Sequence, residues 1–437
     1  GSATYTGSEL SALVSGAGRA VVANRQKSRP CALIPTIPTS VSTAFTGTHN
    51  LMMTAPGDFD AVAIVAMNID SSTMTIDAAS VAVSERSDTS KTVPIIGGSN
   101  YNVPAAAGTQ NGFIAITWDG GSASVTVAAG TAALPTFKVS DFTPISSIPR
   151  VDDSTKFPLV IVREYFNSRT VSILSFASAA EVDNFNTGMA PYEFYQVAQA
   201  AVDGATAANA ANFTSTWSAG ASTQSMRIFG LLFRIRGTAD TVLVAGDSIL
   251  RSVAAAGNLT LNNAANITNG WFPTTMRALA SKTAPIGYVN LGISGDTSTS
   301  YLARAKAAIT ALRPSVAGYM PYTTNDAPTT AIVTTQEMSR ALDFVDTCRT
   351  GGTAPFLMQS SPCNRSLTLR LDVNSKIAAM SGLVASIDLN TPLYDAANSG
   401  NYYFAAGTNY DDTHPNAAGH TLLSASAATQ LRTLLGR

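Results

Sequence analysis

The sequence is poor in charged residues, since Asp, Glu, Lys and Arg together make up 13% of its 437 residues. That share is about half of what is usual in globular proteins. The 27 basic and 28 acidic residues nearly cancel, and neither sign forms a long run. A protein that binds nucleic acid needs a basic patch or stripe, so the sequence excludes this class of partner.

The sequence also lacks an apolar run of the roughly 18 residues that a membrane-spanning helix needs. Its first residues, "GSATYTGSEL", have neither the basic nor the apolar region of a signal peptide. Low charge together with abundant Ala, Ser, Thr and Gly is typical of proteins outside the cytosol. We therefore expect a protein that is secreted, extracellular or associated with a virion, without a membrane span.

Cysteine and histidine are scarce, with three residues of each. Cys348 ends an expected helix and Cys363 follows the next strand, so the two residues lie at opposite ends of that strand, beyond the reach of a disulfide. We expect Cys31, Cys348 and Cys363 to be free thiols. The few His and Cys residues also lack the spacing of metal ligands, and we predict no metal site and no cofactor.

The first half of the chain contains short apolar or alternating runs separated by Gly, Pro, Ser, Asn and Asp. Spacing of this kind is typical of an antiparallel β-sandwich or jelly roll. The Ala-rich stretch "EFYQVAQAAVDGATAANAANF" interrupts the series and is interpreted as a helix or a covering loop. We assign residues 1–237 to a β-rich, sandwich-like accessory domain and expect it to bind glycan or to serve in a larger assembly.

From residue 238 onward, strand-like and helical stretches alternate, and no low-complexity linker separates them from the first half. Five short apolar strands joined by helices predict a parallel sheet covered on both faces. We therefore assign residues 238–437 to a three-layer α/β domain that packs directly on the first half. The strands are "TVLVAG", "IGYVNLG", "SVAGYMPY", "APFLMQS" and "VASIDLN", and the helices span about 298–312, 330–349, 366–381 and 416–435.

Polar motifs stand where the predicted strands end, which is the edge at which such sheets gather reactive groups. The first strand ends in Gly246-Asp247-Ser248, "GISGDTS" follows the second, "TTNDAP" follows the third, and "YDDTHPN" precedes the last helix. Each motif alone has a simpler interpretation. The first can be a turn in which Ser248 caps a helix, and Asn325-Asp326 can be another turn.

Together the motifs supply the groups of acyl transfer. A serine hydroxyl such as that of Ser248 becomes a good nucleophile when a histidine, with an ordinary pKa of about 6.5, removes its proton. Among the three histidines, His414 alone lies next to acids at a helix entrance. Asp411, three residues earlier, can accept a hydrogen bond from its ring and fix the tautomer. We expect His49 and His420 to be structural.

Negative charge that develops on the substrate oxygen needs fixed hydrogen-bond donors. The sequence offers three of them: the backbone N–H of Ser248, the backbone N–H of Gly295 and the side-chain amide of Asn325. Gly295 can equally serve a left-handed backbone conformation, an interpretation that is compatible with the first.

In this order, the four motifs resemble the blocks of the SGNH (also called GDSL) hydrolases, a family of serine esterases. The resemblance covers residues 238–437 and implies the flavodoxin-like, three-layer fold of that family. It implies Ser248 as the nucleophile, Gly295 and Asn325 as oxyanion-hole donors, His414 as the base and Asp411 as its orienting acid.

Two details of the resemblance concern single positions. Asp411, rather than Asp412, stands three residues before His414, where the family has its acid. Thr324 stands where the family often has a glycine, and this departure bears on the shape of the loop more than on the role of Asn325.

Aromatic residues gather next to the expected base in "NYYFAAGTNY". Aromatic faces beside polar amides suit a sugar or an aryl ester, although half of these residues can instead pack beneath the loop. We predict substrate contacts for Tyr402, Tyr403 and Tyr410, with Phe404 and Trp271-Phe272 as further candidates near the site.

The leading hypothesis is a metal-independent serine esterase that removes O-acetyl groups from a polysaccharide through an acyl-enzyme. The substrate class is then a carboxylic ester, an acetylated glycan in particular. The rival hypothesis is a phage-tail or surface protein with a binding or structural role, whose hydrolase-like domain is catalytically idle. Hydrolysis of p-nitrophenyl acetate by the wild type and by Ser248→Ala separates the two.

Overall fold

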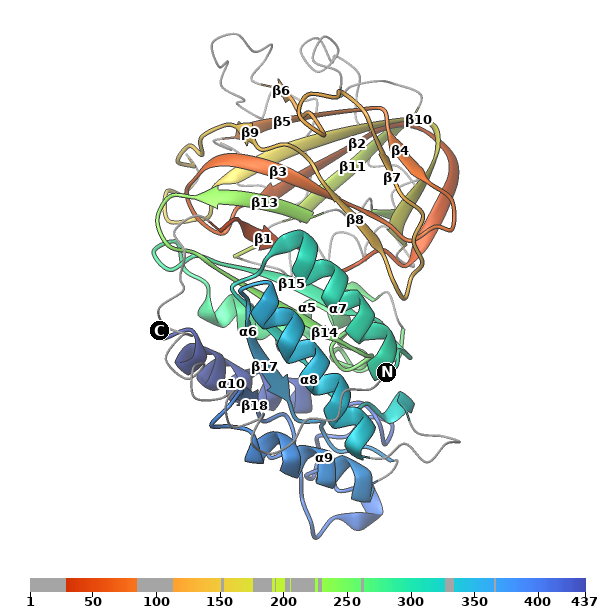
Figure 1. The fold of residues 1–437 in the computed structure, drawn as a ribbon, viewed down its shortest axis with the longest axis vertical. Helices are drawn as coiled ribbons and strands as arrows, with labels where there is room; N and C mark the ends of the chain where they lie inside the picture. The colour runs from red at the N-terminus through yellow and green to blue at the C-terminus, as the bar shows by residue number, and fades with distance from the viewer. Residues whose placement is uncertain are drawn as a thin grey trace.

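The computed structural model describes residues 29–84, 113–150, 153–175, 191–192, 194–200, 205, 225–226, 230–260, 263–326, 334–364 and 367–437. In Figure 1 the strands of the first half form one end of the molecule and the helices of the second half form the other. The boundary at residues 237/238 between two domains remains a prediction.

The second half contains a five-stranded parallel sheet with the strand order β15-β14-β16-β17-β18. Counted along this half, the order is 2-1-3-4-5, as in flavodoxin-like folds. The prediction of a parallel α/β sheet is therefore confirmed. The strands are β14 (Asp240–Gly246), β15 (Ile286–Gly292), β16 (Val316–Tyr319), β17 (Ala354–Met358) and β18 (Ala385–Ile387).

Two groups of helices accompany this sheet, since α6 packs on α10 while α7 packs on α8 and α8 on α9. Among the described residues, no helix is both long and apolar enough to cross a membrane. The short helices α5 and α6 were not predicted. The helices are α5 (Ala264–Asn269), α6 (Trp271–Leu279), α7 (Ser298–Leu312), α8 (Thr334–Thr350), α9 (Leu367–Ala379) and α10 (Ala417–Leu434), with 3-10 turns η2 (Thr324–Asp326) and η3 (Ser399–Asn401).

The described strands of the first half pair in antiparallel fashion. One sheet has the order β11-β2-β10-β5-β6 with β12 beside β10, another has the order β1-β13-β3-β8 with β9 beside β3, and β4 pairs with β7. The sandwich or jelly-roll class of this half remains a prediction. The strands are β1 (Cys31–Leu33), β2 (Ser40–Thr54), β3 (Phe59–Asn68), β4 (Met74–Ile76), β5 (Ala78–Ser84), β6 (Ile114–Ala115), β7 (Val125–Val127), β8 (Thr136–Val139), β9 (Thr143–Pro144), β10 (Leu159–Ser175), β11 (Phe194–Ala200), β12 (Ser225–Met226) and β13 (Gly230–Ile235).

The start of the Ala-rich stretch is a strand, so its interpretation as a helix or covering loop was wrong for residues 194–200. Strand β11 pairs along its whole length with β2, from Phe194 opposite Met53 to Ala200 opposite Gly47. Pairing with a long neighbouring strand outweighs the helix preference of a few alanines, because propensity is a weak local term. Apart from Ala205, the rest of the stretch lies outside the described residues.

A short segment near residue 31 joins the sheets of the two halves. Strand β1 pairs with β13, and the next residue, Ile34, bridges to β15: its N–H donates to the Tyr288 carbonyl (2.8 Å) and its carbonyl accepts from the Asn290 N–H (3.0 Å). Gly287 permits this approach, since a Cβ there would stand 2.1 Å from the Ala32 carbonyl oxygen. One hydrophobic core contains residues of both halves, which confirms that they pack directly on each other.

The three cysteines are all buried, and none forms a disulfide, as predicted. Burial raises the pKa of the Cys31 thiol to about 12, because a thiolate is poorly solvated there. Cys348 is buried in the same core, on helix α8. Burial raises the pKa of the Cys348 thiol as well, and a thiol with a raised pKa is a weak nucleophile, so Cys31 and Cys348 act in packing.

Candidate active site

Ser248 lies immediately beyond the carboxyl end of β14, in a run of turns covering residues 248–256. Its carbonyl accepts from the N–H of Val253 (3.0 Å), and the N–H of Arg251 donates to the carbonyl of Asp247 (2.9 Å). The segment is not an α-helix, so Ser248 is not a helix cap. The turns leave its hydroxyl at the edge of the sheet, toward the loop before α10.

His414 reaches Ser248 from that loop. The Nε2 atom of His414 is 2.8 Å from the Oγ atom of Ser248. On the other side of the ring, Nδ1 is 2.9 Å from both carboxylate oxygens of Asp411. A hydroxyl, an imidazole and a carboxylate therefore form one continuous hydrogen-bonded line, which is the geometry of a proton relay in acyl transfer.

The backbone of the same loop fixes the Asp411 carboxylate. The N–H groups of His414 (2.8 Å) and Thr413 (3.3 Å) both donate to its Oδ1 atom. Partial burial alone would raise the pKa of Asp411, but the hydrogen bonds from His414 and Thr413 outweigh it and lower the pKa below its ordinary value. Asp412 points elsewhere and accepts from Asn409 (3.0 Å), so the structure separates the two neighbouring acids.

The three expected oxyanion donors lie in segments that follow β14, β15 and β16. Gly295 has a φ of +77°, in the left-handed region, while no atom lies within 4 Å of where its Cβ would stand, so backbone conformation rather than space requires glycine. The Asn325 amide nitrogen donates to the carbonyl of Asp296 (2.9 Å) and lies 3.4 Å from Thr323 Oγ1. Among the described residues, no protein group accepts from the N–H of Ser248 or Gly295.

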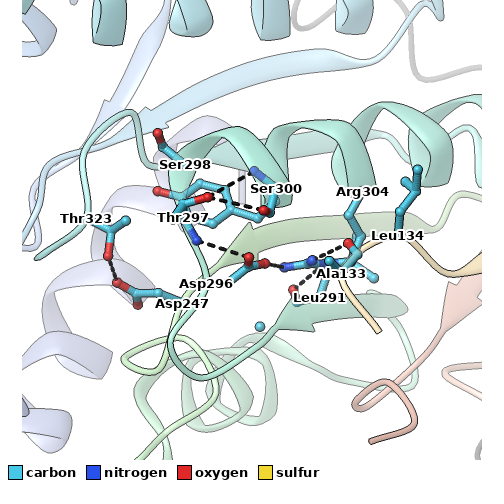
Figure 2. Close-up of polar contacts among 12 residues, drawn as sticks. Ala133, Leu134, Asp247, Leu291, Asp296, Thr297, Ser298, Ser300, Arg304 and Thr323 are labelled. Atoms are coloured by element: carbon cyan, nitrogen blue, oxygen red, sulfur yellow. Dashed lines mark hydrogen bonds and ion pairs between the residues drawn. The ribbon is translucent and has the colours of Figure 1, made fainter. Parts of the chain in front are cut away.

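A buried contact that the sequence analysis missed joins the first and third motifs. The Thr323 hydroxyl donates to the carboxylate of Asp247, as Figure 2 shows, and the N–H of Ile249 also donates to that carboxylate (2.9 Å). Burial raises the pKa of Asp247, against the effect of these hydrogen bonds. One residue beyond Asn325, Asp326 accepts from the N–H groups of Ser298 (2.9 Å) and Thr323 (3.1 Å). The motifs are thus held to one another by buried carboxylates.

No protein-family model matches the chain, and no curated protein matches it. Solved structures do match. They include a member of the lipolytic G-D-S-L family from Veillonella parvula (17% identity, 44% of this chain and 97% of that one, TM-score 0.35) and a psychrotrophic esterase from Pseudoalteromonas (18%, 45% and 100%, 0.34). A carbohydrate acetylesterase family member from Sinorhizobium meliloti matches at 14% identity over 45% of this chain and 100% of that one, with a TM-score of 0.35.

The second half of the chain resembles the SGNH hydrolases. The matching structures include members of the lipolytic G-D-S-L family, and they cover about 45% of this chain. Because a shared fold hosts many chemistries, the function of this chain is inferred from its own side chains and distances.

The aromatic residues near His414 divide into exposed and buried sets. Tyr402 and Tyr410 are 39% and 42% exposed, and Tyr403 is half-buried, with its ring stacked on Tyr394 at 5.9 Å between centroids. The Tyr410 N–H donates to the carbonyl of His414 (3.0 Å). The expectation that Phe404, Trp271 and Phe272 line the site was wrong, because all three are buried in the hydrophobic core.

The other two histidines are buried away from Ser248. His420, on α10, accepts from the Trp271 N–H (3.2 Å) and lies 3.2 Å from the Val253 carbonyl. Burial lowers the pKa of His420 to about 4, so it is neutral near pH 7. His49 stacks on Phe45 in the first half, 4.5 Å between centroids. The His420 ring therefore bonds with the backbone of Trp271 and Val253 rather than with Ser248 or Asp411.

Proposed function

We propose that this chain is a serine esterase that hydrolyses carboxylic esters through an acyl-enzyme, with Ser248, His414 and Asp411 as its catalytic residues. The observation that carries the proposal is the unbroken line of contacts from the Ser248 hydroxyl through the His414 ring to the Asp411 carboxylate, at 2.8 and 2.9 Å. Distances of this size fit direct proton transfer between a nucleophile and its base. The rival hypothesis, a surface protein with a catalytically idle domain, gives no reason for these three side chains to form continuous hydrogen bonds.

In the proposed reaction, Ser248 Oγ attacks the ester carbonyl while His414 Nε2 takes the hydroxyl proton. Asp411 holds the Nδ1–H of the ring and stabilises the imidazolium that forms. His414 then gives the proton to the departing alcohol oxygen, which leaves the acyl group on Ser248. Water, deprotonated by the same ring, attacks the acyl-enzyme, the bond between the acyl carbon and Ser248 Oγ breaks to release the acid, and His414 returns the proton to Oγ.

The negative oxygen of each tetrahedral intermediate would be held by the N–H groups of Ser248 and Gly295 and by the amide of Asn325. The first two N–H groups have no acceptor among the described residues, which supports this role. A primary amide has two N–H groups. One N–H of Asn325 holds the Asp296 carbonyl, and the other makes only the 3.4 Å contact with Thr323, so it can turn to a substrate oxygen.

Within this activity, we propose that the substrate is an O-acetyl group on a polysaccharide. Two tyrosine rings, Tyr402 and Tyr410, stand exposed on the loop that delivers His414, and each joins an apolar face to a hydroxyl. Tyr402 and Tyr403 also have left-handed backbone angles (φ 50° and 66°), a strained conformation that clusters at functional sites. Residues 1–237 would then bind the glycan or attach the enzyme to a larger assembly.

The test is the hydrolysis of p-nitrophenyl acetate by the wild type and by Ser248→Ala. We expect the variant to lose kcat by at least about 10⁴-fold, because the nucleophile and the base act as a unit. Ser281→Ala is the matched control, since the Ser281 hydroxyl closes a turn before β15, at the opposite edge of the sheet. Equal, slow hydrolysis by the wild type and Ser248→Ala would contradict the proposed esterase function.

A separate experiment tests the proposed substrate. It compares the acetate released from acetylated glycans with the turnover of a long-chain p-nitrophenyl ester.

A further inference from the structure

Arg304, on helix α7, has a fully buried side chain that donates to three separate segments. Its Nε donates to the carbonyl of Leu291 at the end of β15 (3.0 Å), and its Nη2 pairs with the carboxylate of Asp296 (2.6 Å). Its Nη1 donates to the carbonyl of Ala133, which belongs to the first half (2.6 Å). Figure 2 shows the guanidinium between these groups. The planar fork of arginine can serve three acceptors at once, which an ammonium group on a flexible stem does poorly.

Asp296 connects this arginine to the expected oxyanion donors. It directly follows Gly295, and its backbone carbonyl accepts from the Asn325 amide (2.9 Å). Its carboxylate accepts from Arg304 through Oδ2 and from the Thr297 N–H through Oδ1 (3.0 Å). The position of Asp296 therefore fixes the position of the Gly295 N–H through the chain. It fixes the position of the Asn325 amide through the hydrogen bond.

The acceptor from the first half is part of a closed turn. Within residues 131–134, the Thr131 N–H donates to the Leu134 carbonyl (3.0 Å), and the Leu134 N–H donates to the Thr131 hydroxyl (3.0 Å). This turn leads into β8, which packs against α7. The Ala133 carbonyl is thus held in front of Arg304 by its own turn and by the packing of the strand that follows.

We propose that Arg304 is a positioning residue through which the 131–134 turn of the first half sets the oxyanion donors Gly295 and Asn325. The inference rests on the proposed esterase function. It makes the first half a working part of the esterase site rather than an appended module. Donors in an oxyanion hole act through their exact placement, and a displacement of about 1 Å can cost on the order of 100-fold in rate.

The first test is Arg304→Lys, which keeps the buried positive charge and so limits the loss of stability, but lacks the fork. With p-nitrophenyl acetate we expect kcat to fall by about 10- to 100-fold with KM within about threefold, because the donors act on the transition state. In the same variant, amide hydrogen exchange over residues 293–299 should be about 10-fold faster. Arg313→Lys is the control, since it makes the same change at the exposed end of the same helix.

The second test is a double-mutant cycle with Asn325→Ala. If Arg304 acts through the oxyanion donors, Arg304→Lys should cost much less in the Asn325→Ala background than in the wild type. Thr131→Ala, which removes one hydrogen bond of the turn, should lower kcat in the same direction by a smaller factor. Unchanged kcat, unchanged exchange over residues 293–299, or additive effects in the double variant would each overturn the positioning role. Absence of Ser248-dependent hydrolysis in the wild type would instead remove the esterase itself, so the two failures can be told apart.

Discussion

The two halves of the chain contribute to the candidate site in different chemical forms. The second half supplies side chains at strand ends, with Ser248 after β14 and His414 before α10. The first half supplies hydrogen-bond acceptors, two of them backbone carbonyls: the Ala133 carbonyl meets Arg304, and the Ile37 carbonyl (3.4 Å) meets Arg251 together with the Thr36 hydroxyl. Reactive side chains form motifs that can be found in a sequence, whereas every residue has a carbonyl, so backbone support has no signature.

The largest effect expected within the second half, after loss of the serine itself, comes from Asp411→Asn. An amide in place of the carboxylate favours the wrong tautomer of His414, and kcat should fall by about 10³- to 10⁴-fold. Steady-state hydrolysis of p-nitrophenyl acetate measures the loss.

The neighbouring variant, Asp412→Asn, is the matched control for that experiment. Asp412 has a left-handed φ of 67°, which asparagine adopts readily, and its carboxylate contacts Asn409 rather than His414. Its kcat should stay within about twofold of the wild type. If the two variants lose activity equally, the distinction between a reactive acid and a structural one at this loop is lost.

An intermediate effect is expected from Asn325→Ala. Removal of one oxyanion donor should lower kcat by about 100-fold and change KM little, because the amide acts on the charge of the transition state. Asn263→Ala, at the cap of α5, removes an amide of the same kind and should cost about 1 kcal/mol of stability without a change in kcat. An unchanged kcat in Asn325→Ala would remove this side chain from the site.

The smallest expected effect is a change in the free energy of unfolding with pH. Its measurement tests whether His420 has a structural role. Since the folded-state pKa of His420 is about 4 and the ordinary value is 6.5, the unfolded chain binds more protons between these values. The stabilisation is therefore complete above pH 6.5 and is lost as pH falls toward 4. Between pH 8 and pH 5 the loss should be on the order of 2 kcal/mol, measured as the free energy of unfolding in urea.

The comparison for this pH effect is His420→Gln, because a glutamine can still pair with the Trp271 N–H and the Val253 carbonyl but does not titrate. Its unfolding free energy should fall less over the same pH range. The same pH dependence in both proteins would mean that another group is responsible, and that the burial of His420 has no thermodynamic consequence.

Much of the second half was predictable from sequence because its signals are local. Helix α7 begins at Ser298 and ends at Leu312, as its pattern indicated, and β15 matches "IGYVNLG" residue for residue. The serine, the histidine and the choice of Asp411 over Asp412 also followed from motif order and from the spacing of three residues. The roles of these residues remain proposals, while their contacts are those that the motifs predicted.

Other features could not be predicted, because they depend on partners that are distant along the chain. The Ala-rich start of β11 is a strand because β2 lies beside it. Phe404 lies near the histidine motif in sequence and Trp271 lies in the long segment after the serine motif, yet both side chains are buried in the core. The contact between Asp247 and Thr323 joins residues whose segments meet only when β14 and β16 pair.

The sequence by itself determined the strands of the parallel sheet and the helices α7, α8, α9 and α10, and it determined which reactive groups stand near their ends, because side-chain periodicity and chemistry belong to short stretches. Only the tertiary structure decided which groups meet. The ring of His414 lies within hydrogen-bond distance of Ser248, and Arg304 donates to a carbonyl of the first half, because packing and hydrogen bonding hold distant segments a few ångströms apart. Those distances arise only when the whole chain folds.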